Sequence, residues 1–228
     1  MSNECNKASK EVLRNKNRRK SMIPISDILI RSISGYAFIV PILILYFLYL
    51  KKVGRNQTLL HIIAVFVFCY YLFGILTVTG IGFTKSMTFR PNLSLTPFIG
   101  MITGPIDTML NVILFVPMGL FLPLLYKKYN SIKAVAITGF MFSISVEMVQ
   151  MFGWGSSDIN DLITNTIGAC LGYLIYKVLW KLLPNKLMKQ LYSKNINVIV
   201  EVLFFTVCTF VIMVTAQRWV VHSVLNIP

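Results

Sequence analysis

Long apolar runs separated by short polar or basic segments dominate the pattern of this chain. Six of these runs approach or exceed the roughly 20 residues that an α-helix needs to cross a bilayer. Their expected ranges are 32–50, 59–83, 109–126, 134–152, 158–183 and 196–216. Most charged residues lie between the runs or near their ends. The pattern therefore predicts an all-α fold, a polytopic membrane helix bundle with about six transmembrane helices.

Composition supports this class. Hydrophobic residues make up 56% of the 228 residues and charged residues only 13%, whereas a soluble domain carries about 25% charged residues. Lys and Arg number 22 against 8 Asp and Glu, and eight of these bases fall within residues 1–31. We expect this basic segment to contact the lipid bilayer and bind anionic lipid headgroups, at ~1 kcal/mol per base, and we expect no nucleic acid partner.

The chain divides into four segments. They are a basic N-terminal tail (1–31), two N-terminal transmembrane helices (32–83), a core with three transmembrane helices (84–183), and a basic linker with a C-terminal transmembrane helix (184–228). Four scattered cysteines and the isolated His61 and His222 are interpreted as packing or interfacial residues, because their spacing fits neither a disulfide framework nor a zinc site.

Polar residues recur at helical spacing inside the predicted core. An acid at mid-depth in hydrocarbon costs at least ~2.5–3.5 kcal/mol, so it normally faces a partner or a wet cavity. The helical stripe at 158, 161, 165, 168 and 172 begins with acids and an amide and ends with two glycines that allow close helix packing. We predict a polar pocket at one end of the third to fifth helices, formed by Asn111, Glu147, Gln150, Asp158, Asp161 and Asn165.

Several chemistries fit these residues. The simplest is that they are helix caps and interhelical hydrogen bonds, which is the favoured interpretation for Asp158 alone. Clustered carboxylates also suit a shared proton, an ammonium group or sugar hydroxyls. A divalent cation at Glu147, Asp158 and Asp161 stays open, while no other metal site or cofactor is expected.

Four segments together resemble the VanZ-like family in order and spacing. They are SLTPF (94–98), NVILFVPMGLFLP (111–123), SISVEMVQ (143–150) and GSSDINDLITNTIGACLGY (155–173). The resemblance implies a multi-pass protein of the bacterial cell membrane whose family namesake raises resistance to teicoplanin more than to vancomycin, with no established enzymatic step. The family's polar positions fall on the six pocket residues above. Its structural marks fall on Pro97, Pro117, Gly119, Pro123, Gly168 and Gly172.

One position departs from the family pattern. Many members carry an arginine three residues before the first Asp of the fourth segment, where this chain has Gly155. An anion-binding role for that arginine is therefore not carried over.

The leading functional hypothesis is a teicoplanin or lipoglycopeptide resistance factor at the cell surface, with a lipoglycopeptide or cell-wall precursor lipids as partners. A non-enzymatic role is favoured over an enzymatic one. The alternative is a membrane-embedded enzyme that acts on a lipid-linked or headgroup substrate through the carboxylate pocket. A transporter ranks last because the sequence has no inverted repeat, and a purely structural protein remains the simplest competitor.

The number of basic residues is equal on the two sides of the predicted bundle, so this count does not determine the orientation in the membrane. The loops at 51–55, 127–133 and 177–194 together carry 11 bases, and the opposite side carries 11 once the tail is included. If the segment before Lys51 does not cross the membrane fully, or inserts late, the loops determine the orientation and the acidic pocket is expected to face outward.

Overall fold

The predicted all-α membrane bundle is confirmed. The computed structural model describes residues 25–81, 89, 93–94, 98, 104–152, 157–193, 197–217 and 219–224. Within them lie seven α-helices: α2 (Ile25–Lys52), α3 (Leu59–Val78), α5 (Pro105–Leu125), α6 (Ile132–Gln150), α7 (Ile159–Leu182), α8 (Asn185–Leu191) and α9 (Val198–Ile212). Six are long and apolar enough to cross a membrane, with α9 extended to Gln217 by a π-helical turn.

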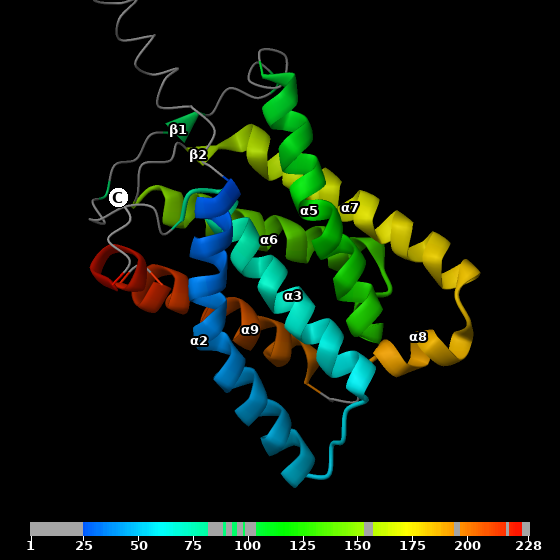
Figure 1. The fold of residues 1–228 in the computed structure, drawn as a ribbon. Coiled ribbons are helices and arrows are strands. Elements are labelled where there is room, and N and C mark those ends of the chain that lie inside the picture. Colours follow the sequence, from blue (N-terminus) through cyan, green and yellow to red (C-terminus); the bar gives the residue numbers. More distant parts are fainter. Residues whose placement is uncertain are drawn as a thin grey trace, which may run out of the picture.

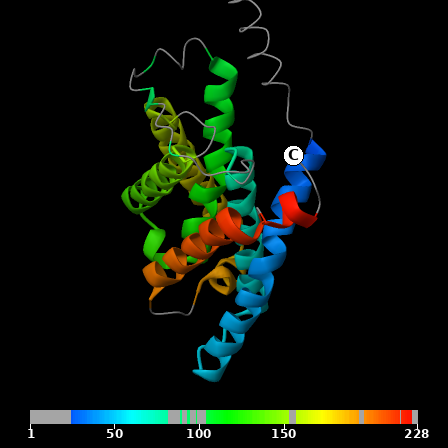
Figure 2. The same ribbon diagram turned by 90° about the vertical axis from the view of Figure 1, so that its left-hand side faces the viewer.

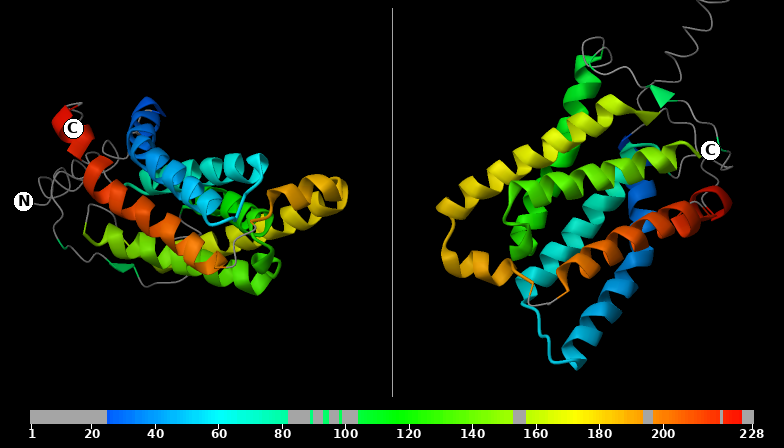
Figure 3. Two further views of the ribbon diagram at one scale, coloured as in Figure 1. Left: turned by 90° about the horizontal axis from the view of Figure 1, so that it is seen from below. Right: turned by 180° about the vertical axis from the view of Figure 1, so that it is seen from behind.

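The helices form two groups, which meet where α3 packs against α5, and α9 packs on α2 and α3. Figure 1 shows α5 and α7 crossing each other, with α6 running antiparallel to them, so that the N-termini of α5 and α7 and the C-terminus of α6 lie at one end. Figure 2 shows α2 and α3 beside this group. Seen from behind in Figure 3, α9 crosses the α2–α3 pair, and α9 contacts both of these helices. The short helix α8 lies at the opposite end from the α5 and α7 N-termini.

Two short parallel strands pair at the end of the bundle where α5 and α7 begin. Strand β1 (Leu93–Ser94) pairs with β2 (Ser157–Asp158), with Leu93 opposite Ser157 and Ser94 opposite Asp158. Residues 93–94 lie in the connection between the second and third predicted spans. Two of the segments that carry the family resemblance therefore meet in space.

Close contact between α5 and α7 is the most extensive helix packing in the described chain. Gly119 lies against the backbone of Ala169, and a Cβ atom at Gly119 would overlap the Ala169 carbonyl group. Gly168 and Gly172 likewise lie against the carbonyl oxygens of Val112 and Val116. The sequence predicted close packing at Gly168 and Gly172, and the structure identifies α5 as the partner helix.

Helix α5 continues through Pro117 and Pro123. A proline removes one backbone hydrogen bond from a helix. Just after Pro117, the Tyr71 hydroxyl of α3 inserts into the ladder, because it accepts from the Met118 amide at 3.2 Å and donates to the Leu114 carbonyl at 2.6 Å. Tyr71 thus bridges two backbone groups that are four residues apart and ties α3 to α5.

Some boundaries differ from those expected. Helix α2 begins at Ile25, so residues 25–31 of the predicted tail are helical, with Asp27 in the first turn. Arg31 is only 1% exposed, and the Gln217 side chain donates to its carbonyl oxygen. The predicted span began after Arg31, where the uncharged run begins, whereas the helix continues through this buried base. Pro97 and residues 1–24 lie outside the described residues.

The α5–α7 contact generates a stability prediction. Gly172→Ala places a methyl group on the Val116 carbonyl, and such overpacking costs ~1–3 kcal/mol. Gly74→Ala is the matched control, because Gly74 lies inside α3 and a Cβ there meets no atom within 4 Å. Thermal unfolding of the purified proteins in detergent should show a lower midpoint for Gly172→Ala and an unchanged or higher midpoint for Gly74→Ala. Equal midpoints would contradict the close-contact assignment.

Candidate functional site

A pocket of about 420 Å³ lies at the end of the bundle where α5 and α7 begin and α6 ends. Its walls come from these three helices, from the end of α3 and from β2. The lining residues are Val78, Thr79, Gly104, Asp107, Thr108, Leu110, Asn111, Leu114, Glu147, Gln150, Asp158, Asn160, Asp161 and Thr164. The pocket therefore lies at one end of the third to fifth predicted spans, which is where the sequence predicted a polar site.

Asn111 and Asp161 connect the two helices that cross beside the pocket. Asn111 Nδ2 donates a hydrogen bond of 2.6 Å to Asp161 Oδ1. Asn111 precedes Val112, whose carbonyl oxygen packs against Gly168. The glycine contact therefore sets the separation at which this hydrogen bond forms.

Glu147 holds the entry of α7 against the end of α6. Its side chain is 5% exposed, and its Oε2 atom accepts a hydrogen bond of 3.1 Å from the Asp158 amide. Its backbone carbonyl accepts from Ser157 Oγ at 2.9 Å. Glu147 thus lines the pocket and also fixes β2, so its substitution would change both the charge and the shape of the site.

Asp158 is the N-cap of α7, as the sequence predicts. Its Oδ1 atom accepts from the Asn160 amide at 2.9 Å and from Asn160 Nδ2 at 2.8 Å. Asn160 Oδ1 in turn accepts from the Phe98 amide at 2.7 Å. Phe98 has a φ of 68°, a conformation that bulky residues rarely adopt. The Asp158–Asn160 pair therefore binds the backbone at Phe98, in the connection before α5, to the start of α7.

Five of the six predicted pocket residues line this pocket, namely Asn111, Glu147, Gln150, Asp158 and Asp161. Gln150 also donates from Nε2 to the Thr79 carbonyl at 2.7 Å, which ties α6 to the end of α3. Asn165 is not among the lining residues. It is buried between α6 and α7, where its Nδ2 donates to Ser143 Oγ at 2.9 Å.

Sequence reasoning missed Asn160 and Thr79. Asn160 lies two residues after Asp158, so it falls outside the spacing of three and four residues that defined the stripe on α7. Thr79 contributes its backbone carbonyl, which no side-chain pattern indicates. Asp107 was also not among the predicted pocket residues, yet it lies one helical turn before Asn111 and lines the same pocket.

The pocket is acidic. Asp107, Glu147, Asp158 and Asp161 all line it, and none of the lining residues in the described part of the chain is a Lys or Arg. Carboxylates beside a low-dielectric membrane interior attract cations more strongly than they do in water. Among the described residues, no three His, Cys, Asp or Glu side chains are arranged to hold a metal ion.

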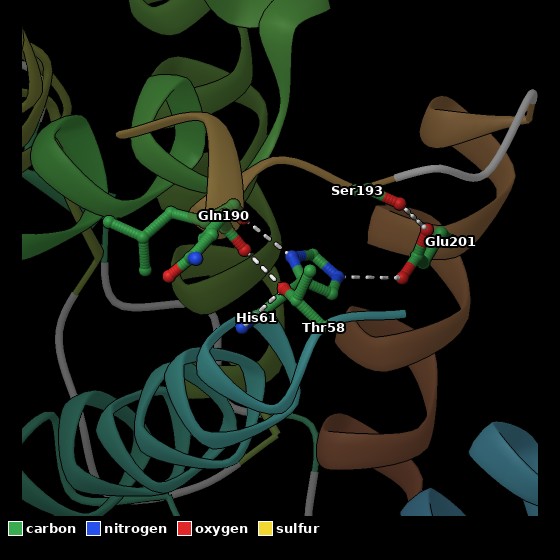
Figure 4. Close-up of polar contacts among 6 residues, drawn as sticks. Thr58, His61, Gln190, Ser193 and Glu201 are labelled. Atoms are coloured by element: carbon green, nitrogen blue, oxygen red, sulfur yellow. Dashed lines mark hydrogen bonds and ion pairs between the residues drawn. The ribbon is translucent and has the colours of Figure 1, made fainter. Parts of the chain in front are cut away.

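A second buried polar cluster lies at the opposite end of the bundle (Figure 4). His61 is fully buried in the first turn of α3, and its Nδ1 atom donates to the Leu191 carbonyl of α8 at 2.7 Å. Its Nε2 atom faces Glu201 Oε1 of α9 at 3.9 Å, and Ser193 Oγ donates to Glu201 Oε2 at 3.2 Å. The Thr58 hydroxyl donates to the Gln190 carbonyl and caps α3. We call this set the His61 cluster.

The expectation that His61 is isolated was wrong. His61, Leu191 and Glu201 are separated by 130 and 10 residues along the chain, and no periodic pattern connects positions so far apart. Ionisable residues within membrane spans usually pair with one another. The presence of Glu201 near the start of the last span was therefore the sequence signal that could have indicated a partner for His61.

Comparison with known proteins covers the pocket but only part of the His61 cluster. The profile of the family described as VanZ/LLP1 matches residues 38–183, which include every lining residue of the pocket. The chain is also 36% identical over 114 residues to "Protein VanZ" of Enterococcus faecium. That alignment covers 49% of this chain and 66% of the relative, just under two thirds of its length. No solved structure matches the chain.

The His61 cluster generates a stability prediction. Removing one member of a buried ionisable pair costs ~3–5 kcal/mol in soluble proteins, because the other member is left without its partner. We expect His61→Leu to lower the unfolding midpoint strongly and Ser193→Ala to lower it slightly. Lys189→Gln on the exposed side of α8 is the control and should have little effect. Thermal unfolding in detergent tests this order, and a His61→Leu midpoint equal to that of the control would contradict it.

Proposed function

The chain belongs to the VanZ/LLP1 family, and from this premise we propose that it acts at the bacterial cell surface as a resistance factor against teicoplanin and related lipoglycopeptides. It is a multi-pass membrane protein with six helices of spanning length. The observation that supports the proposal is the acidic pocket, which lies wholly within the family segment and opens at one end of the bundle.

The chemistry of the pocket fits a ligand that is held at a membrane surface. A lipid-bearing glycopeptide combines a chain that partitions into the bilayer with sugar hydroxyls that donate hydrogen bonds to carboxylates. Binding of such a molecule beside α5 and α7 would compete with its access to cell-wall precursors. This action requires no bond to be made or broken, so it agrees with a non-enzymatic role.

An outward-facing pocket is part of the proposal. The α2–α3 and α5–α6 connections lie at the end opposite to the pocket. At this end Lys51 and Lys52 close the last turn of α2, Arg55 lies in the first connection, and Lys127 and Lys128 lie in the second. Bases in short loops favour the cytoplasmic side, which would leave the pocket on the outer side.

The alternative enzyme has one specific observation in its favour. Glu147 and Asp161 come from different helices and line one pocket, which is the kind of arrangement that general acid and base catalysis uses. Its substrate would be a lipid-linked or headgroup molecule, because the pocket lies at the end of membrane-spanning helices. Turnover of such a substrate by the purified protein, with loss in Asp161→Asn, would support this alternative over simple binding.

The resistance role is tested in a sensitive Gram-positive host that expresses wild type, Asp161→Asn or Asp27→Asn. Asp27 is the matched control because it loses the same charge but lies on α2 outside the pocket. We expect wild type and Asp27→Asn to raise the inhibitory concentration of teicoplanin more than that of vancomycin. Asp161→Asn should lose this protection, because it removes the negative charge of a pocket carboxylate, the one that accepts the hydrogen bond from Asn111. The amount of each protein in the membrane is measured by blot and should be equal. A well-expressed wild type without protection would refute the proposal.

Sidedness is tested by single-cysteine variants in a chain whose four natural cysteines are replaced by serine or alanine. Thr108→Cys lies in the pocket, whereas Lys128→Cys lies in the α5–α6 connection at the other end. An impermeant maleimide should label Thr108→Cys in intact cells and should label Lys128→Cys only after the membrane is opened. The reverse pattern would place the pocket on the cytoplasmic side.

A further inference from the structure

A second cavity of about 270 Å³ lies between α2 and α3, away from the acidic pocket. The two helices diverge toward the loop that joins them (Figure 1), and the cavity occupies this opening. Its inner walls are apolar and include Leu48 of α2 and Ile62 of α3. At its closed side the rings of Phe47 and Phe66 stack with centroids 6.3 Å apart. We call this cavity the α2–α3 groove.

The mouth of the groove is polar and basic. Lys51 of α2 and the amide side chains of Asn56 and Gln57 line it at the loop end. Lys52 and Arg55 add two further positive charges to the same connection. None of the residues that line the groove in the described part of the chain is acidic.

The groove therefore changes from polar to apolar along its depth. Helix α2 ends at Lys52, where the apolar run of the span also ends, so the membrane interface lies near Lys51 and Lys52. Leu48 and Ile44 lie one and two helical turns deeper, about 5 to 10 Å into the hydrocarbon at 1.5 Å per residue. A matching ligand has an anionic head at the interface and a narrow apolar chain below it.

We propose that the α2–α3 groove binds one anionic phospholipid, with its phosphate at Lys51, Asn56 and Gln57 and one acyl chain between Phe47, Leu48 and Ile62. The basic mouth supports an anionic over a zwitterionic headgroup. This site is separate from the basic tail and does not depend on the proposed resistance role.

The test measures which lipids stay bound to the purified full-length protein. The protein is reconstituted in nanodiscs of phosphatidylglycerol and phosphatidylcholine in equal amounts, transferred to a gentle detergent and analysed by native mass spectrometry. Wild type should retain one phosphatidylglycerol in preference to phosphatidylcholine. Lys51→Gln should weaken this retention about fivefold, the factor for ~1 kcal/mol per base at a membrane surface. Added glycerol 3-phosphate should not displace the lipid, because it lacks the acyl chain.

Matched variants separate a defined site from general surface charge. Lys52→Gln removes the same charge from the neighbouring exposed position, which does not line the groove, and should retain lipid as wild type does. Leu48→Trp should fill the groove and abolish retention, whereas Leu45→Trp, at a position that is 66% exposed outside the groove, should not. Equal losses for Lys51→Gln and Lys52→Gln, equal retention of both lipids, or a lipid-free dimer would each overturn the proposal.

Discussion

The backbone contact between α5 and α7 determines much of the rest of the structure. In hydrocarbon, helices gain little from burying apolar side chains against each other, so association relies on close packing at small residues. Gly119, Gly168 and Gly172 allow this contact. It also sets the distance at which Asn111 meets Asp161, and the two helices separate beyond it toward their N-termini (Figure 1). The acidic pocket is thus the space that this crossing leaves at one end.

The sequence predicted those features that repeat at helical spacing. Six long apolar runs indicated the spans, and the stripe on α7 indicated both the glycine contact and part of the pocket. Prediction from the sequence failed where side chains from distant positions in the chain come into contact. Asn165 shares the spacing of the stripe but lies deep enough to bond Ser143 instead. Asn160 is off the stripe, Tyr71 enters the backbone ladder of another helix, and His61 finds partners on α8 and α9. Such pairings depend on how helices cross, which local pattern does not specify.

The described charges divide between the two ends of the bundle. Four acids line the pocket at one end, while the bases of the α2–α3 and α5–α6 connections lie at the other. This distribution agrees with the two proposals, a hydroxyl-rich ligand at the acidic pocket and an anionic lipid at the α2–α3 groove.

The His61 cluster joins a residue inside the family segment to a helix beyond it, because the matched range ends at residue 183 and Glu201 lies on α9. A relative that lacked α9 would keep a buried imidazole with no carboxylate opposite it, which is costly in an apolar interior. Across the family, we expect an ionisable residue at the position of His61 to occur together with an acid on a following helix and to be replaced by an apolar residue where that helix is missing.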